Sequence, residues 1–341
     1  GVIVGMADSG LDKGSLADLP LDLQSTAGRI PRVVMLKSFS GREIPDDPIG
    51  HGTHMAGTIV GSGESSDGQF KGIAPGASLY FQGLLDKDGK INLPSSLQNL
   101  YLPAYLAGVR IHINGWGEVG ANYGVRSSQS DQFIYEHPDF LAIFGAGNQG
   151  PGRSTLTGEA SSKNVLTVGS SQSPRPAFSP EAVDADLAAS SSSRGPTSDG
   201  RIKPELIAPG SAIISVCSRL TESNFSSNQA YTRLGGSSMA TSVTGGAAAL
   251  LMEYLKSKTG ITKPSSALLK ALLINGARTP KEGPSDQNGF GILDLAGTIL
   301  PLEENSVKIA EIQEGIKSGA NQEFRFQVSD PSRAFKATLT W

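Results

Sequence analysis

Short apolar runs recur along the first 300 residues, with helix-like segments between them. Runs of four to eight apolar residues are typical of strands buried on both faces. They predict strands at 2–7, 33–37, 78–84, 109–113, 140–145, 164–169 and 212–217. Apolar residues at helical spacing predict helices at 51–61, 95–107, 128–137, 239–257 and 265–275. This alternation predicts an α/β fold, a three-layer sandwich whose central, mostly parallel sheet lies between helices.

The pattern changes after residue 300. Residues 301–305, PLEEN, have the composition of a linker. Residues 306–312, 323–328 and 335–341 alternate apolar and polar positions, which predicts strands with one covered face. We therefore expect one domain over 1–300 and, over 305–341, the start of a C-terminal β-sandwich or jelly-roll-like domain. Three strands cannot close a sandwich, so we expect this domain to continue beyond Trp341.

Composition and charge remove several classes of protein. The 341 residues carry a net charge of −3 with no block of like charge, so we expect no nucleic-acid partner. No apolar stretch reaches the length of a membrane span. Cys217 is the only cysteine, which excludes an intrachain disulfide, and its apolar surroundings predict a buried, inert thiol.

The most informative segment is the run from Gly235 to Leu255, GGSSMATSVTGGAAALLMEYL. It places Ser238 at the mouth of a long helix. Backbone N–H groups at a helix start are unpaired and carry partial positive charge. A serine nucleophile there has an anion-binding site beside it. The segment therefore predicts acyl-transfer chemistry, provided that a histidine, a carboxylate and a second oxyanion donor stand elsewhere.

Three other segments supply those partners. The apolar run 2–4 predicts a strand that ends near Asp8, and HGTHMAGTIVG opens with His51. A second run, 141–144, leads Asn148 into a glycine-rich loop. The carboxyl ends of parallel strands are where an α/β sheet binds ligands, so Asp8 and Asn148 are expected at one edge.

The order Asp8, His51, Asn148, Ser238, with the motifs HGTH, GAGN and GSSMA, resembles the subtilisin-like serine proteases. These are the subtilases, or peptidase family S8, and the likeness is greatest to alkaline subtilases with a C-terminal β-domain. The resemblance implies a serine endopeptidase acting on polypeptides. It implies that Asp8 orients His51, His51 serves as general base, Ser238 as nucleophile and Asn148 as oxyanion donor. It also implies a secreted or cell-surface monomer made with a pro-segment.

The resemblance further implies a pocket for the residue before the cut. Its expected walls and base are Gly115, Trp116, Gly117, Gly145, Ala146, Gly147 and Thr157. Trp116 is equally well explained as a core residue. Walls without charge predict a preference for large apolar residues. Glu159 is the one acid placed to favour a basic residue instead.

Several alternatives stay open. Loops such as Asp184–Asp186 could hold the structural calcium common in the family, although no metal ligand is assigned and no cofactor is needed for catalysis. A metal pair of His51 and His54 is less favoured than a packed, hydrogen-bonded His54. A sedolisin-type acidic site and an α/β-hydrolase fit the motifs poorly. A catalytically silent subtilase that serves as a binding or scaffold module is the alternative from a different class.

Overall fold

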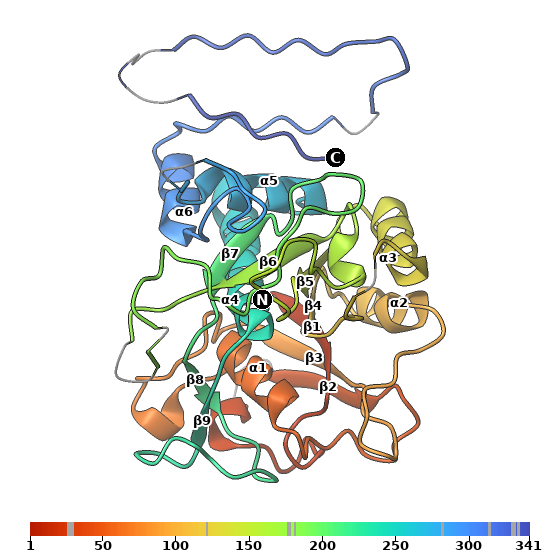
Figure 1. Ribbon diagram of the computed structural model, residues 1–341, viewed down its shortest axis with the longest axis vertical. Coiled ribbons are helices and arrows are strands. Elements are labelled where there is room, and N and C mark those ends of the chain that lie inside the picture. The colour runs from red at the N-terminus through yellow and green to blue at the C-terminus, as the bar shows by residue number, and fades with distance from the viewer. Residues whose placement is uncertain are drawn as a thin grey trace.

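The computed structural model describes residues 1–25, 31–120, 122–175, 179–180, 182–280, 283–312, 315–328, 332 and 335–341. Within these ranges, seven parallel strands form one sheet in the order β2-β3-β1-β4-β5-β6-β7 (Figure 1). The strands are β1 (Ile3–Asp8), β2 (Val33–Ser38), β3 (Ser78–Gly83), β4 (Ile111–Asn114), β5 (Leu141–Gly145), β6 (Leu166–Ser171) and β7 (Leu206–Pro209). A separate antiparallel pair consists of β8 (Ile213–Val216) and β9 (Tyr231–Leu234).

Helices cover both faces of the sheet (Figure 1). They are α1 (His51–Val60), α2 (Gln98–Leu106), α3 (Val125–Glu136), α4 (Ser237–Tyr254), α5 (Ser266–Gly276) and α6 (Leu295–Glu303). Short 3-10 turns occupy Leu21–Leu23, Glu64–Ser66 and Glu159–Ser161, and a π turn at Leu255–Thr259 extends α4. The predicted three-layer α/β architecture is therefore confirmed.

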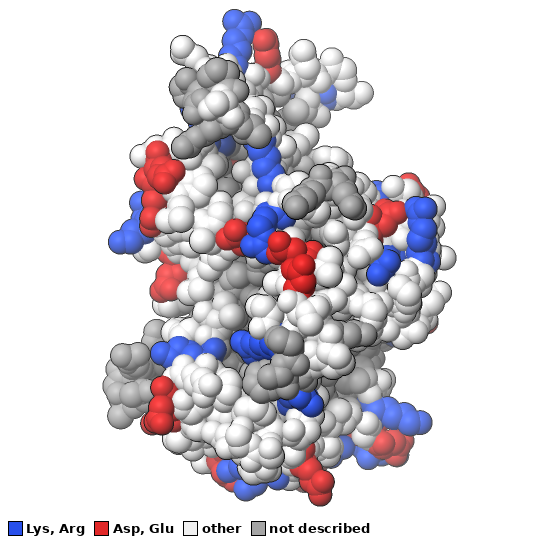
Figure 2. Space-filling model, turned by 60° about the vertical axis from the view of Figure 1, so that its left-hand side comes forward, with Lys and Arg blue, Asp and Glu red and all other residues white. Residues whose placement is uncertain are grey.

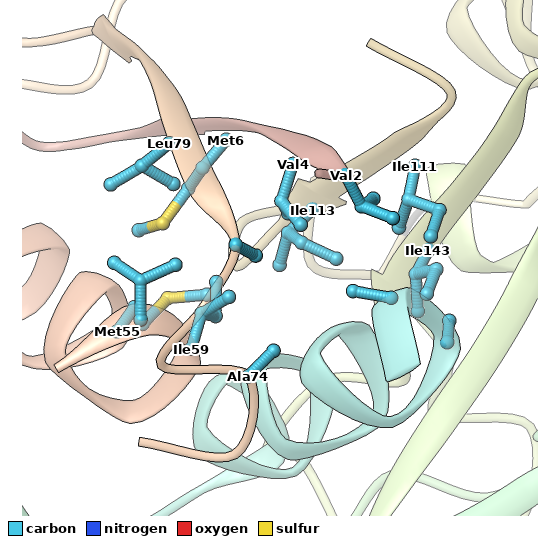
Figure 3. Close-up of a cluster of buried hydrophobic side chains, with 14 of the residues drawn as sticks. Val2, Val4, Met6, Met55, Ile59, Ala74, Leu79, Ile111, Ile113 and Ile143 are labelled. Carbon is cyan, nitrogen blue, oxygen red and sulfur yellow. The ribbon is translucent and has the colours of Figure 1, made fainter. Parts of the chain in front are cut away.

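Two apolar clusters hold the layers together. The larger joins one sheet face to α1, α4 and α5, and Figure 3 shows Val4 and Ile113 of the sheet beside Ile59 of α1. The smaller joins the opposite face to α2 and α3 through side chains such as Phe144 and Tyr101. Burying each large apolar side chain contributes roughly 1.5–3 kcal/mol. These clusters fix the sheet edge on which the polar residues below are placed.

Helix α4 approaches the sheet more closely than a side chain allows. A Cβ added to Gly245 would overlap the side chain of Ile113 in β4. Glycine weakens a helix interior by about 1 kcal/mol relative to alanine, so its place in α4 is explained by packing. The close contact brings the start of α4, with Ser238, to the end of β4.

Three elements of the α/β domain differ from the prediction in their presence, their pairing or their first residue. Strand β7 was not predicted, because its apolar residues 206–208 are too few to stand out between Pro204 and Pro209. The run 212–217, predicted as a sheet strand, pairs instead with β9 outside the main sheet. Helix α4 begins at Ser237, two residues before its predicted start, so Ser238 is its second residue.

The strands predicted for the C-terminal segment are not found. Among its described residues, 306–312, 315–328 and 335–341 form no strand, and part of the segment loops away from the α/β domain (Figure 1). Lys336 donates to the carbonyl of Ala277 at 3.0 Å, and Thr340 donates to that of Ala267 at 2.6 Å. The expected linker at 301–305 is in part the last turn of α6, whose first turn is capped by Asp294. Alternation alone did not form strands here, because a sheet needs several partners.

The surface agrees with the mixed composition. On the face drawn in Figure 2, basic and acidic side chains are interspersed. No helix in the described ranges combines the length and apolar character needed to span a bilayer.

Candidate active site

The sheet brings the predicted site residues to one edge. Strands β1, β4 and β5 are neighbours, and all three run in the same direction. Asp8 is the last residue of β1, Gly115 follows the last residue of β4, and Asn148 lies three residues after β5. A Cβ added to Gly115 would lie 2.9 Å from Asp8 Oδ2, so these two strand ends are in contact.

Asp8 and His51 form a hydrogen-bonded pair. His51 Nδ1 lies 2.6 Å from Asp8 Oδ1. The Asp8 side chain is buried, whereas that of His51 is 30% exposed and reaches solvent at the first residue of α1. Burial acts to lower the pKa of His51, but the negative charge of Asp8 and its hydrogen bond outweigh burial and raise that pKa above its ordinary value. The pair can therefore accept a proton at His51 and stabilise the imidazolium.

Ser238 lies beside this pair without bonding to it. Its hydroxyl donates to the carbonyl of Gly115 at 2.9 Å, and the structure gives it no hydrogen bond to His51 among the described residues. Gly115 also lies against Asp8, so the side chains of Asp8 and Ser238 approach the same short stretch of backbone. The Ser238 hydroxyl has a single hydrogen, so it must give up its bond to Gly115 before it can donate to His51.

Asn148 is exposed and is oriented by the start of α4. Its Oδ1 accepts the backbone N–H of Ser237 at 2.9 Å. The hydroxyl of Ser237 in turn accepts the N–H of Gly147 at 3.1 Å. Since the amide oxygen is engaged, the Nδ2 group remains as a donor next to Ser238. Gly236, at φ +133°, leaves room for the amide, because a Cβ there would lie 3.1 Å from both of its polar atoms.

The expected pocket residues also converge. A Cβ added to Gly117 would lie 2.6 Å from Thr157 Cβ, and one added to Gly147 would lie 3.0 Å from Thr157 Cγ2. Thr157 therefore packs against both expected walls, and its backbone N–H donates to the carbonyl of Ala146 at 3.1 Å. Its hydroxyl is buried and has no partner in the part of the chain that is described. Gly145 packs against Ser237 on the helix side.

Two pocket residues are engaged elsewhere. The indole N–H of Trp116 donates to the carbonyl of Ala7 at 3.0 Å, and its ring packs edge-on against Phe144. These contacts favour the interpretation of Trp116 as a core residue over its role as a wall of the pocket. Glu159 is buried, accepts the N–H of Glu118 at 2.8 Å and lies 3.5 Å from Arg126. Its charge is thus already partnered.

The residues suggested as alternative metal ligands have other partners in the described structure. His54 is buried, its Nε2 donates to the carbonyl of Ile213 at 3.0 Å, and burial lowers its pKa to about 3, as expected of a packed histidine. In the loop suggested for calcium, Asp186 pairs with Arg278, and Asp184 accepts the backbone N–H of Asp186 at 2.9 Å. Among the described residues, no three His, Cys, Asp or Glu side chains gather at one point.

Sequence reasoning missed a set of polar residues behind His51. Asp47, Ser9 and Thr53 are buried and hydrogen-bonded to one another. Asp47 stands four residues before His51, but no periodicity or spacing marks it. Cys217 is buried, as predicted.

Comparison with known proteins identifies the family. The subtilase family model, peptidase S8, matches residues 1–292. The serine protease AprX of Bacillus subtilis is 34% identical over 278 residues, which cover 77% of this chain and 59% of AprX. TagA of Dictyostelium discoideum, a serine protease/ABC transporter B family protein, is 27% identical over 100% of this chain and 25% of its own length. The chain thus corresponds to only part of these relatives.

Solved structures agree in fold. The self-cleaved protease domain of PatA superposes with a TM-score of 0.65 at 21% identity, covering 89% of this chain and 97% of that domain. Fervidolysin from Fervidobacterium pennivorans, a keratinolytic enzyme related to subtilisin, has a TM-score of 0.64 at 21% identity and covers 88% of this chain and 42% of its own. The parallel sheet, the order of the four motifs and the match over residues 1–292 lead to one conclusion: this chain belongs to the subtilase family, peptidase family S8.

Proposed function

We propose that this chain is a serine endopeptidase that hydrolyses polypeptides through Asp8, His51 and Ser238. The observation that carries the proposal is the 2.6 Å pair of Asp8 and His51 beside a serine at a helix N-terminus. The Ser238 oxygen attacks the substrate carbonyl carbon while its proton passes to His51 Nε2. Asp8 holds the opposite ring nitrogen, so the imidazolium that forms remains paired.

The oxyanion is bound by two donors in this proposal. As the carbonyl oxygen becomes negative, it accepts the backbone N–H of Ser238 and the Nδ2 group of Asn148. The C–N bond then breaks as His51 returns its proton to the leaving amine. Water attacks the acyl-enzyme by the same route and releases Ser238.

The proposal includes a preference for large apolar residues before the cut. The walls contributed by Gly115, Gly117 and Gly147 are backbone without charge, and Glu159 is partnered by Arg126. Thr157 forms the base and limits the depth of the pocket.

The remaining expectations rest on the family resemblance. We propose secretion or cell-surface location, a pro-segment in the precursor, a monomeric state and a domain division near residue 300. Structural calcium, in loops such as that of Asp184 and Asp186, stays a prediction.

A fluorophosphonate probe tests the function directly, because it reacts with an activated serine. We expect labelling of Ser238 and its loss in Ser238→Ala, with peptide hydrolysis reduced by several orders of magnitude. Ser242→Ala is the matched control, since Ser242 lies one turn along α4 and its hydroxyl bonds only to the carbonyl of Ser238 among the described residues. A folded parent protein that neither labels nor cleaves peptides supports the scaffold alternative.

A further inference from the structure

A second buried carboxylate lies behind the catalytic pair. Asp47 is fully buried and accepts four hydrogen bonds, two on each oxygen. Oδ1 accepts from the Ser9 hydroxyl at 2.8 Å and from the Gly50 N–H at 2.9 Å. Oδ2 accepts from the Thr53 N–H at 2.8 Å and from its hydroxyl at 2.6 Å. Burial raises the pKa of Asp47 above its ordinary value, whereas the hydrogen bonds from Thr53 and Ser9 act in the opposite direction, because they favour the ionised carboxylate.

Asp47 takes the place of a missing helix cap. Helix α1 begins at His51, and the residue before it, Gly50, has φ +80° and no side chain to cap the free N–H groups. A buried helix end without partners is costly. Asp47 supplies both the acceptors and the negative charge that the helix N-terminus favours. It therefore fixes the turn of backbone on which His51 stands.

Ser9 connects Asp47 to the catalytic carboxylate. Its backbone N–H donates to Asp8 Oδ1 at 2.8 Å, the same oxygen that pairs with His51. Its hydroxyl bonds to Asp47 and accepts the N–H of Gly52 at 2.9 Å. Ser9 therefore bonds both to Asp8, at the end of β1, and to Gly52, in the first turn of α1. It holds these two elements together in addition to the direct bond between Asp8 and His51.

We propose that Asp47 is a positioning residue for the peptidase reaction, and that it sets the geometry and the proton affinity of His51 through Ser9 and the first turn of α1. This inference rests on the proposed function of His51 as general base. It assigns a role to a residue that touches neither substrate nor reacting atoms.

The charges around His51 determine the sign of the expected effect. Asp8 and Asp47 both favour the imidazolium form and raise the pKa of His51. His54, one turn along α1, is neutral because burial lowers its pKa to about 3. Asp12, whose backbone N–H donates to Thr53 of α1, forms an ion pair with Arg219. Removing the charge of Asp47 therefore lowers the pKa of His51.

The test uses Asp47→Asn and Ser9→Ala. An asparagine brings an NH2 group against donors, so two of the four bonds are lost. We expect kcat to fall roughly ten- to hundredfold with little change in KM, because a misplaced general base affects the chemical step. The acid limb of the kcat/KM profile should move to lower pH in Asp47→Asn. Ser9→Ala removes the acceptor of the Gly52 N–H and one of the four bonds to Asp47 but keeps the Asp47 carboxylate, so it should lower kcat less, with recovery in Ser9→Thr.

Asp131→Asn is the matched control. Asp131 is also buried and accepts the backbone N–H groups of Lys163 and Asn164 at 3.0 and 2.8 Å, far along the chain from His51. Its loss should lower Tm without moving the acid limb. The proposal is overturned if Asp47→Asn and Ser9→Ala lower Tm as Asp131→Asn does but leave kcat and the acid limb unchanged. Should Asp47→Asn not fold, Ser9→Ala with its threonine rescue decides.

An NMR titration of the His51 ring separates this inference from the proposed function. In a Ser238→Ala background, which does not depend on turnover, Asp47→Asn should lower the pKa of His51 and Asp131→Asn should not. A parent protein without peptidase activity refutes the proposed function. An unchanged His51 pKa in Asp47→Asn refutes the inference.

Discussion

The two halves of the proposed catalytic centre differ in how far they are assembled. On one side, Asp8 and His51 are already paired, and Ser9 and Asp47 satisfy the polar groups behind them. On the other side, Ser238 is bonded to the carbonyl of Gly115 instead of the base. Buried carboxylates are tolerated only when they are fully hydrogen-bonded, whereas a hydroxyl can exchange partners by one rotation. The hydrogen bonds of the base half are therefore fixed by folding, whereas on the nucleophile half the Ser238 hydroxyl must exchange its bond to Gly115 for one to His51 if the proposed reaction is to begin.

After the loss of Ser238 itself, the largest effect on the nucleophile half is expected at Asn148. Asn148→Ala removes an oxyanion donor and should lower kcat about 100- to 1000-fold, roughly 3–4 kcal/mol of barrier. Steady-state kinetics on a peptide substrate, with KM measured separately, checks this value. Gln149→Ala is the control, because Gln149 is the exposed neighbour in the same loop. Equal kcat in Asn148→Ala and Gln149→Ala would exclude Asn148 from the oxyanion site.

The base half is tested by pH. Because Asp8 raises the pKa of His51, kcat/KM should fall as the pH drops through that raised value, by about tenfold per pH unit below it. Asp8→Asn should shift this limb to lower pH, since the stabilising charge is lost, and should also lower kcat. Rate profiles of both proteins between pH 4 and 9, roughly the range in which histidine titrates, give the comparison. If the acid limb of kcat/KM lies at the same pH in both proteins, the pairing with Asp8 is not the cause of the raised pKa of His51.

The smallest effect concerns the pocket. Thr157→Gly removes the base that touches Gly117 and Gly147, and it should increase kcat/KM for phenylalanine relative to alanine before the cut by about tenfold. Thr157→Ser, which keeps the hydroxyl and removes the methyl group, should give an intermediate ratio. Competition between matched peptides measures this ratio directly. An unchanged ratio in both variants places the pocket elsewhere.

The sequence predicted which strand ends lie together better than it predicted the polar groups around them. Asp8 and Asn148 follow strands whose apolar runs are visible, and parallel strands end at a common edge, so their proximity follows from the pattern. His51 and Ser238 were assigned by motif. The remote cap at Asp47 was missed, because it depends on the conformation of a loop that no periodicity describes. The bond from Ser238 to Gly115 was also out of reach, since a rotamer leaves no trace in the sequence.

The fold shows the same division. Six strands of the main sheet were predicted from buried runs, whereas β7 was not, because its three apolar residues lie between prolines. The C-terminal strands failed for the opposite reason. Residues 323–328 alternate well, yet Phe324 and Phe326 are about half exposed, at 47% and 51%. Alternation of apolar and polar residues shows which face of a strand must be buried, but it does not provide the neighbouring strands or helices that bury it.

The contact of Gly245 with Ile113 has a consequence for the nucleophile. Ser238 and Gly245 are seven residues apart, about two turns, so they lie on the same face of α4. Ile113 lies in β4, and Gly115, which accepts the hydrogen bond from Ser238, follows two residues later, just after the strand ends. The distance between α4 and β4 at Gly245 therefore also determines where the Ser238 oxygen lies. A methyl group added at Gly245 would overlap Ile113, push the helix away from the strand and displace Ser238 with it.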